Sequence, residues 1–235
     1  MRILQSIYPG SAWRKLGRLL SAFCFLSAVA PYSWGGVGPY IGAIGGVATL
    51  SADGGSKTTS AGLNLSSYAP SNGGALNVFA GVSVHNYVSL QLNYIWNGND
   101  LRLNSASSGT GAFYQEDRTS SQQAVIFDTL VYFRPRRSRI RPYLATGIGV
   151  VHFSSREQQL ISSGGAPALP PARFASTEPA LRVHVGIDLR LVRRLDFRYS
   201  FSDTISSNEV SKNLSPPGPR GMENFQNLFG FVVRF

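Results

Sequence analysis

The two residues best placed to do chemistry together are His152 and Ser154, which stand two positions apart. On a β-strand, side chains two residues apart share one face, so the imidazole and the hydroxyl would be neighbours. That combination of groups is one that nucleophilic catalysis uses. Short motifs also arise often by chance. The competing interpretation is a histidine and a serine near the outer rim of a strand, with no catalytic role.

Other catalytic or cofactor chemistry has little support in the sequence. The histidines at 85, 152 and 184 fall in different segments and lack the spacing of a metal site. No phosphate-binding glycine loop or dinucleotide fingerprint is present. The only cysteine, Cys24, lies near the N-terminus, so no disulfide is expected. We therefore expect neither a metal nor another cofactor.

Arginines and aspartates form a larger group of residues that could interact. They alternate with apolar residues in several segments, whereas lysine, which is common on solvent-facing surfaces, occurs only three times. Opposite charges on a shielded face can satisfy one another within a network. We predict an internal charge network made by Asp128, Arg134, Arg182, Asp188, Arg190, Asp196, Arg198 and Arg234.

The elements that hold these residues are predicted to be β-strands, because apolar and polar residues alternate with period two. In 181–191 every second residue is apolar, and charged or small residues stand between. Segments 38–50 and 141–153 are apolar on both faces, which would also suit a buried helix, but each of their glycines would weaken a helix by about 1 kcal/mol. The eight expected strands are 38–50, 76–85, 88–97, 125–134, 141–153, 181–191, 195–202 and 225–235.

The connections between these strands alternate strictly between short and long. Short links fall at 85–87, 135–140 and 192–194. The four long links are rich in Ser, Gly, Asn and Pro and cover 51–74, 98–121, 155–176 and 203–222. In an up-and-down meander every second connection lies at the same end. One end should therefore carry tight turns and the other end four long loops.

Alternation alone does not say which way the apolar face points. Charged residues make up 14% of the chain, against about 25% in an ordinary soluble domain. Strands of about ten residues can cross a bilayer when they are tilted, and because lipid cannot satisfy backbone hydrogen bonds they must close on themselves. The prediction is an all-β, eight-stranded antiparallel up-and-down transmembrane β-barrel with its apolar face outward. The alternative is a soluble secreted barrel with an apolar ligand inside.

The N-terminal residues read as a cleavable signal peptide at 1–30. Four cations precede an apolar run over 19–29, and Ala28 and Ala30 form a small-residue cleavage pattern. The cut is expected between 28 and 34, which leaves the barrel domain at 31–235. Removal of residues 1–30 leaves 18 basic against 12 acidic side chains.

Several of the remaining cations gather in the short links. No aromatic residues are interleaved with them as in a nucleic-acid site, so we expect no nucleic-acid partner. Anionic lipid headgroups would suit them, and simple solvation of tight turns is the other interpretation. These basic turns contain Arg136, Arg137, Arg139, Arg193 and Arg194.

The last strand ends on alternating large residues, Phe231, Val233 and Phe235. This ending resembles the C-terminal assembly signal of bacterial outer-membrane β-barrels. With the signal peptide and the loop pattern, the chain resembles the small eight-stranded family that includes the OmpA membrane domain and OmpX. The resemblance implies the outer membrane of a Gram-negative-type bacterium, with extracellular long loops and both termini in the periplasm. It also implies contact with outer-membrane lipids and with the barrel-assembly machinery.

The function expected from this resemblance is non-enzymatic: a barrel with a side-chain-filled lumen that serves envelope structure, surface binding or adhesion. The loop composition specifies no external ligand. A first alternative is suggested by the lipid A deacylase barrels, which the His152 and Ser154 arrangement resembles. That resemblance would make Ser154 the nucleophile, His152 the base and Glu157 or Glu178 the orienting acid, although this chain lacks the Asn that follows the serine in that family. A second alternative is a narrow porin-like channel.

Overall fold

The computed structural model describes residues 38–51, 56–57, 64–218 and 221–235. The predicted signal peptide at 1–30, its cut at 28–34 and Cys24 lie outside the described residues. The elements in chain order are β1 (Gly38–Leu50), β2 (Ser56–Lys57), β3 (Asn64–Pro70), β4 (Gly73–Ser83), β5 (Val88–Ser107), β6 (Phe113–Tyr132), β7 (Ile140–Ser162), β8 (Arg173–Val192), β9 (Leu195–Ser207), α2 (Glu209–Lys212) and β10 (Gly221–Arg234).

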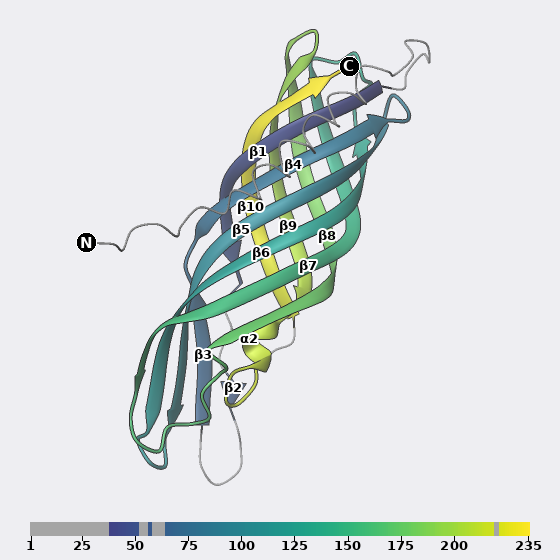
Figure 1. The fold of residues 1–235 in the computed structure, drawn as a ribbon. Coiled ribbons are helices and arrows are strands. Elements are labelled where there is room, and N and C mark those ends of the chain that lie inside the picture. Colours follow the sequence, from purple (N-terminus) through teal and green to yellow (C-terminus); the bar gives the residue numbers. More distant parts are fainter. Residues whose placement is uncertain (1–37, 52–55, 58–63, 219–220) are drawn as a thin grey trace, which may run out of the picture. The chain divides into compact units, whose positions relative to one another are not determined.

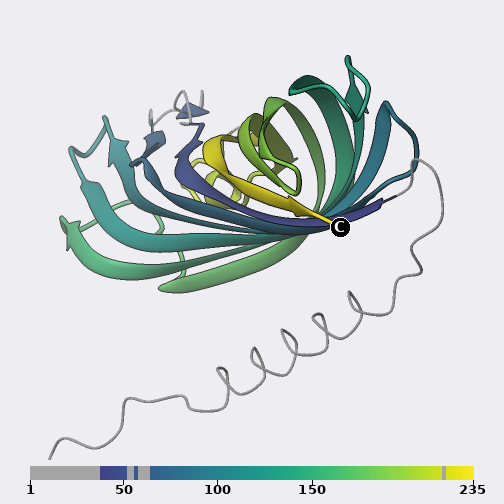
Figure 2. The ribbon, with the colours of Figure 1, turned by 90° about the horizontal axis from the view of Figure 1, so that it is seen from above.

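Eight of the strands form one closed antiparallel ring (Figure 1). The order around the ring is β4, β1, β10, β9, β8, β7, β6 and β5, and the pairing of β5 with both β4 and β6 closes it. The first and last strands of the ring pair from Tyr40 opposite Arg234 to Leu50 opposite Asn224, and Figure 2 shows β10 in yellow beside β1 in purple. Closure leaves the ring without an edge strand that exposes unpaired backbone. The predicted eight-stranded antiparallel ring is confirmed.

The two ends of the ring differ in their connections. Short turns at 84–87, 133–139 and 193–194 define what we call the turn end. The C-terminus is also there, since the backbone amide of Arg234 donates to the carbonyl of Arg194 at 2.8 Å. We call the opposite end, where Figure 1 places α2, the hairpin end.

The connections at the hairpin end contain more strand than the sequence predicted. β5 and β6 continue as a paired hairpin to Ala106 opposite Phe113, so the predicted loop 98–121 shrinks to a turn at 108–112. The predicted loop 155–176 is likewise shortened by β7 and β8, and β3 in the first long connection pairs with the outer part of β5. The prediction was wrong here because the outward residues of these extensions are polar, which removes the apolar period while the backbone ladder continues.

The apolar side of each strand faces outward. Val185 in β8 is 48% exposed, whereas Arg198 in β9 is 1% exposed. A soluble barrel with an inward apolar face is contradicted by this orientation. Outward apolar residues around the middle of the ring form a surface that we call the apolar belt, which includes Val47, Val78, Leu92, Val125, Phe127, Leu144, Ile148, Val150, Leu181, Val183, Val185, Phe201, Phe229 and Phe231.

Two tyrosines fill interior space against glycines of a neighbouring strand. A Cβ atom on Gly81 would lie 2.4 Å from Cζ of Tyr40, and one on Gly186 would lie 2.5 Å from Cζ of Tyr143. Both distances are shorter than van der Waals contact, so only glycine lets these rings lie against the opposing backbone. Both rings lie beside Arg198, one of the charged interior residues described below.

The interior at the hairpin end contains an apolar cluster that is covered by α2. Val210 on α2 and Leu214 just after it are buried in a cluster. Asn208 caps the helix by accepting from the amide of Ser211 at 2.9 Å. Within the described residues, no helix has the length and apolar character needed to cross a membrane. The other buried members of the cluster are Leu50, Tyr68, Leu101, Leu103, Tyr114, Phe153 and Met222.

Candidate functional site

Asp128 on β6 is the centre of one buried charge cluster in the barrel interior. Its Oδ2 atom lies 3.0 Å from Nη1 of Arg182 and 2.9 Å from Nε2 of His184. The side-chain amide of Asn93 donates to the same oxygen at 2.9 Å. Asp128 and Arg182 are fully buried. The opposite charges are therefore paired where water does not reach them, as buried ions require.

Asp188 on β8 is the centre of a second cluster, nearer the turn end. Arg198 forms a two-pronged pair with it, from Nε to Oδ1 at 2.6 Å and from Nη2 to Oδ2 at 2.8 Å. Tyr132 donates its hydroxyl to Oδ2 at 3.1 Å, and Nη2 of Arg234 approaches the same oxygen at 3.3 Å. Such forked arginine–carboxylate pairs combine strength with fixed geometry. This cluster ties β6, β8, β9 and β10 together across the interior.

Asp196 extends this second cluster towards the turn end. It forms an ion pair with Arg234, and Nε of Arg190 lies 3.7 Å from its Oδ1. Arg190 is half-buried and also donates to the carbonyl of Arg137 at 3.2 Å. Arg134, by contrast, is exposed in the turn that follows Tyr132. Its inclusion in the predicted network was wrong, because β6 ends at Tyr132 and the inward parity does not continue into the turn.

Arg141 belongs to the same interior region, although the sequence analysis did not include it. Its guanidinium lies 3.6 Å from the ring centre of Tyr132, and its Nη2 donates to the carbonyl of Asn86 at 3.1 Å. The signal that could have found it is its parity, which it shares with inward Tyr143. The gap between Arg141, Arg198 and their neighbours has no room for a water-sized sphere.

A further buried ion pair, Glu116 with Arg118, lies in the hairpin extension of β6. Arg118 also donates from Nε to the hydroxyl of Ser155 at 2.9 Å and from Nη2 to the carbonyl of Pro171 at 2.9 Å. Its guanidinium lies 4.5 Å from the ring centre of Phe174. Burial raises the pKa of Glu116 and lowers the pKa of Arg118, while their mutual attraction opposes both shifts. The sequence analysis missed this pair because it placed both residues in a loop.

His152 and Ser154 lie on the outer face of β7, each with a different partner. Nδ1 of His152 is 2.9 Å from the hydroxyl of Thr177, and the hydroxyl of Ser154 is 3.1 Å from that of Ser121. The two side chains share one face, as their two-residue spacing predicted. The hydrogen bonds, however, run across to β8 and β6 rather than from the imidazole to the serine.

The two candidate orienting acids face the interior. Glu157 is opposite buried Arg118 in the strand register. Oε1 of Glu178 lies 3.7 Å from Nζ of Lys212, the last residue of α2. Neither carboxylate is therefore on the side of the wall that carries His152. The catalytic grouping of His152, Ser154 and Glu157 is contradicted by this placement.

The residues predicted at the turn end are gathered there. In the basic turns, Arg136 is half-buried and the others are exposed. Phe231 and Val233 point outward on β10, and Phe235 follows the strand directly; their exposures are 52%, 37% and 43%. The ring of Phe231 meets that of Phe197 edge-on at 6.0 Å between centres. In the described part of the chain, no group of three or more His, Cys, Asp or Glu side chains could hold a metal ion.

One family model and several solved structures are similar to this chain. The family model described as outer membrane protein beta-barrel domain matches residues 17–235. Neisserial surface protein A (NspA) has a similar structure, with a TM-score of 0.50 and 14% identity over 84% of this chain and 97% of that one. OprG from Pseudomonas aeruginosa gives a TM-score of 0.48 and 13% identity over 85% of this chain and 97% of its own. No curated protein matches the sequence.

Proposed function

Since this chain belongs to the outer membrane protein beta-barrel domain family, we propose that it is a non-enzymatic surface-binding barrel whose hairpin end faces the outside of the cell. It is a small outer-membrane β-barrel protein of the Gram-negative envelope. The proposal adds to this the orientation of the barrel, adhesion or surface binding as its role, and a lumen filled by side chains.

The observation that carries the proposal is the difference between the two ends of the ring. At the hairpin end, β5 and β6 remain paired for nine residues beyond the belt, from Gly98 opposite Ser121 to Ala106 opposite Phe113. The apolar cluster under α2 supports these extensions from inside. A binding surface that is already ordered loses less conformational entropy when it meets a partner. The tight turns at the other end offer no comparable surface.

The packed interior supports a structural and binding role over conduction. The two aspartate-centred clusters cross the lumen, and the apolar cluster with Val210 and Leu214 occupies the hairpin end. An eight-stranded barrel is just wide enough for its own side chains to fill it. A narrow channel would need a continuous water-wide path through both layers.

Export and assembly complete the proposal. Residues 1–30 would direct export and be cut between 28 and 34, leaving 31–235 as the membrane domain. Phe231, Val233 and Phe235 would serve as the assembly signal that the barrel-assembly machinery recognises, as the family resemblance implies. Both termini and the basic turns would then face the periplasm, where each arginine could gain about 1 kcal/mol from anionic lipid headgroups.

Surface labelling of single cysteines tests the orientation. Thr110 is exposed at the tip of the β5–β6 hairpin, and Arg193 is exposed in the turn between β8 and β9. In intact cells a membrane-impermeant maleimide should label Thr110→Cys, whereas Arg193→Cys should react only after the outer membrane is opened. The unsubstituted chain is the control, since its one cysteine, Cys24, lies in the proposed export segment. If only Arg193→Cys were labelled in intact cells, the barrel would have the opposite orientation to the one proposed.

A further inference from the structure

The outward residues of β7 and β8 change in a regular order between the apolar belt and the hairpin end. Residues directly opposite each other on the two strands form rungs, and five successive rungs face outward. Two apolar rungs are followed by two rungs with small or hydrogen-bonding side chains and then by two arginines. The rungs are Ile148 with Leu181, Val150 with Pro179, His152 with Thr177, Ser154 with Ala175, and Arg156 with Arg173.

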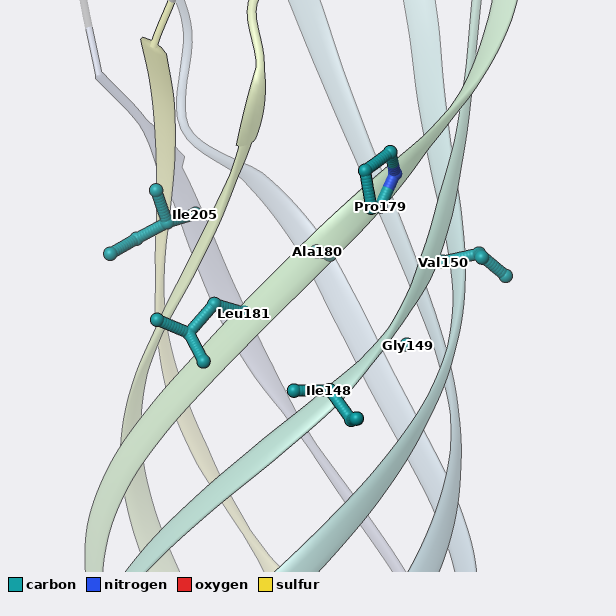
Figure 3. A pocket seen from close by; sticks show the side chains of 7 residues that line it. All are labelled: Ile148, Gly149, Val150, Pro179, Ala180, Leu181 and Ile205. Carbon is teal, nitrogen blue, oxygen red and sulfur yellow. The ribbon is translucent and has the colours of Figure 1, made fainter.

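The apolar rungs border a hollow of about 690 Å³ in the outer wall (Figure 3). Figure 3 shows Ile148, Val150, Leu181 and Ile205 around it. Ile148 is 69% exposed, the largest exposure among the apolar side chains of the belt. A hollow between protruding aliphatic side chains fits a hydrocarbon chain.

The arginine rung places two like charges directly opposite each other. Opposed side chains on an antiparallel pair have Cβ atoms about 4.5–5.5 Å apart, and like charges in that position destabilise the pair. Arg156 and Arg173 are both exposed, and among the described residues neither guanidinium has an ion pair or hydrogen bond. A dianionic group held between them would convert the repulsion into attraction.

The nearby acids do not serve as that group. Glu157 and Glu178 face the interior, as described above. Asp117 faces outward on β6, but its Oδ1 lies 2.7 Å from Nε of Arg102, so it is already paired. The described outer surface around Arg156 and Arg173 therefore keeps an uncompensated positive charge.

A groove of about 600 Å³, lined in part by hydroxyl groups, joins the arginines to the neighbouring strand β6. Thr119, Ser121 and Ser154 line it with hydroxyl groups, and Gln158 hydrogen-bonds to Thr119. Hydroxyl and amide side chains of this kind both donate and accept hydrogen bonds. The groove is therefore suited to a saccharide between the cationic rung and the apolar hollow.

We propose that the outer face of β6, β7 and β8 is a binding site for a phosphorylated glycolipid of the surrounding membrane. Its phosphate lies between Arg156 and Arg173, its sugar lies against the hydroxyl-lined groove, and an acyl chain occupies the hollow beside Ile148 and Leu181. A phosphate monoester carries up to two negative charges, which matches the two guanidinium groups.

Depth along the strands favours a glycolipid over a glycerophospholipid. From His152, at the edge of the belt, to Arg156 is four residues, or about 10 Å along the membrane normal for a strand tilted by about 40°. The headgroup layer of an ordinary leaflet is only about 5–7 Å thick. A phosphate carried on a sugar reaches this height more readily than one attached to glycerol.

Binding to the purified full-length barrel in detergent tests the site independently of the orientation in cells. The probe is bisphosphorylated, hexa-acylated lipid A, and its retention is measured by native mass spectrometry. Exchanging both cations, as in Arg156→Gln with Arg173→Gln, should weaken retention about 30-fold if each arginine contributes as basic residues do near anionic lipids. Arg134→Gln removes an exposed cation at the turn end that is not one of the basic-turn residues proposed to meet lipid headgroups, and it should leave retention unchanged.

The lipid can be varied as well as the protein. Lipid A without phosphates should bind the unsubstituted barrel as weakly as intact lipid A binds the Arg156 and Arg173 double variant. Inorganic phosphate in millimolar excess should not displace intact lipid A, because it lacks the acyl chains. Equal retention by the double variant, or phosphatidylglycerol binding as well as lipid A, would overturn the proposal. Heat-dependent gel mobility of each variant verifies that it is folded.

Discussion

Replacing Arg198 with methionine should lower the free energy of unfolding by about 3–5 kcal/mol. Arg198 is fully buried and holds both carboxylate oxygens of Asp188 while also donating to Gln91 at 2.8 Å. Methionine fills similar space without a charge, so Asp188 would lose its main partner while it remains out of water. Urea titration in detergent micelles, followed by tryptophan fluorescence, to which Trp96 on the outer face of β5 contributes, measures the change.

A matched variant distinguishes the loss of a buried arginine from the loss of an arginine charge in general. Arg139 is an exposed arginine in the turn between β6 and β7, so Arg139→Met should leave the unfolding midpoint unchanged. Combining Arg198→Met with Asp188→Asn should recover part of the loss, because the unpaired negative charge is then removed. A change of less than 1 kcal/mol for Arg198→Met would show that the interior network does not stabilise the barrel.

Placing an arginine at Val185 should cost about 2–4 kcal/mol, because this position lies midway along the outward apolar face of β8. The cost of a charge on the lipid side falls to about 0–1 kcal/mol near the membrane interface. Leu191 shares the outward parity and is 53% exposed at the turn end of β8. Leu191→Arg is therefore the matched control, with the same side chain and strand at a different depth.

The measurement is the amount of each variant recovered folded in the outer-membrane fraction, with unfolding in detergent as the second readout. Val185→Arg should be depleted, and Leu191→Arg should approach the level of the unsubstituted chain. Equal recovery of the two variants would show that the outward face at Val185 does not lie in the hydrocarbon layer.

The strand pattern and the side of the wall that each residue faces could be predicted because a barrel wall separates two solvents. In β8, Val185 and its apolar neighbours of the same parity face outward, while Arg182 and Asp188 face inward. Apolar and polar residues therefore alternate along each strand, and this alternation indicates which side of the wall each residue faces. The strict alternation of short and long connections then predicted that strands consecutive in the sequence are neighbours in the barrel.

The hairpin end could not be predicted in the same way, because its outer surface is polar and its inner surface is apolar only in part. The sequence therefore placed Glu116 and Arg118 in a predicted loop, although they are buried on β6. Val210 and Leu214 carry no periodic signal either, since they depend on a short helix that folds over the end of the ring. Arg134 was predicted to face inward because it has the same parity as Asp128. It is exposed, since β6 ends at Tyr132 and the alternation of faces ends with the strand.

The claim on which the rest depends is that the chain forms a closed membrane-spanning barrel, and gel mobility of protein from separated envelope fractions tests it most directly. A closed barrel resists detergent until it is heated. The account predicts that the protein is recovered with outer membranes and that unboiled samples migrate differently from boiled ones. Identical mobility before and after boiling, with release of the protein by salt alone, would contradict it.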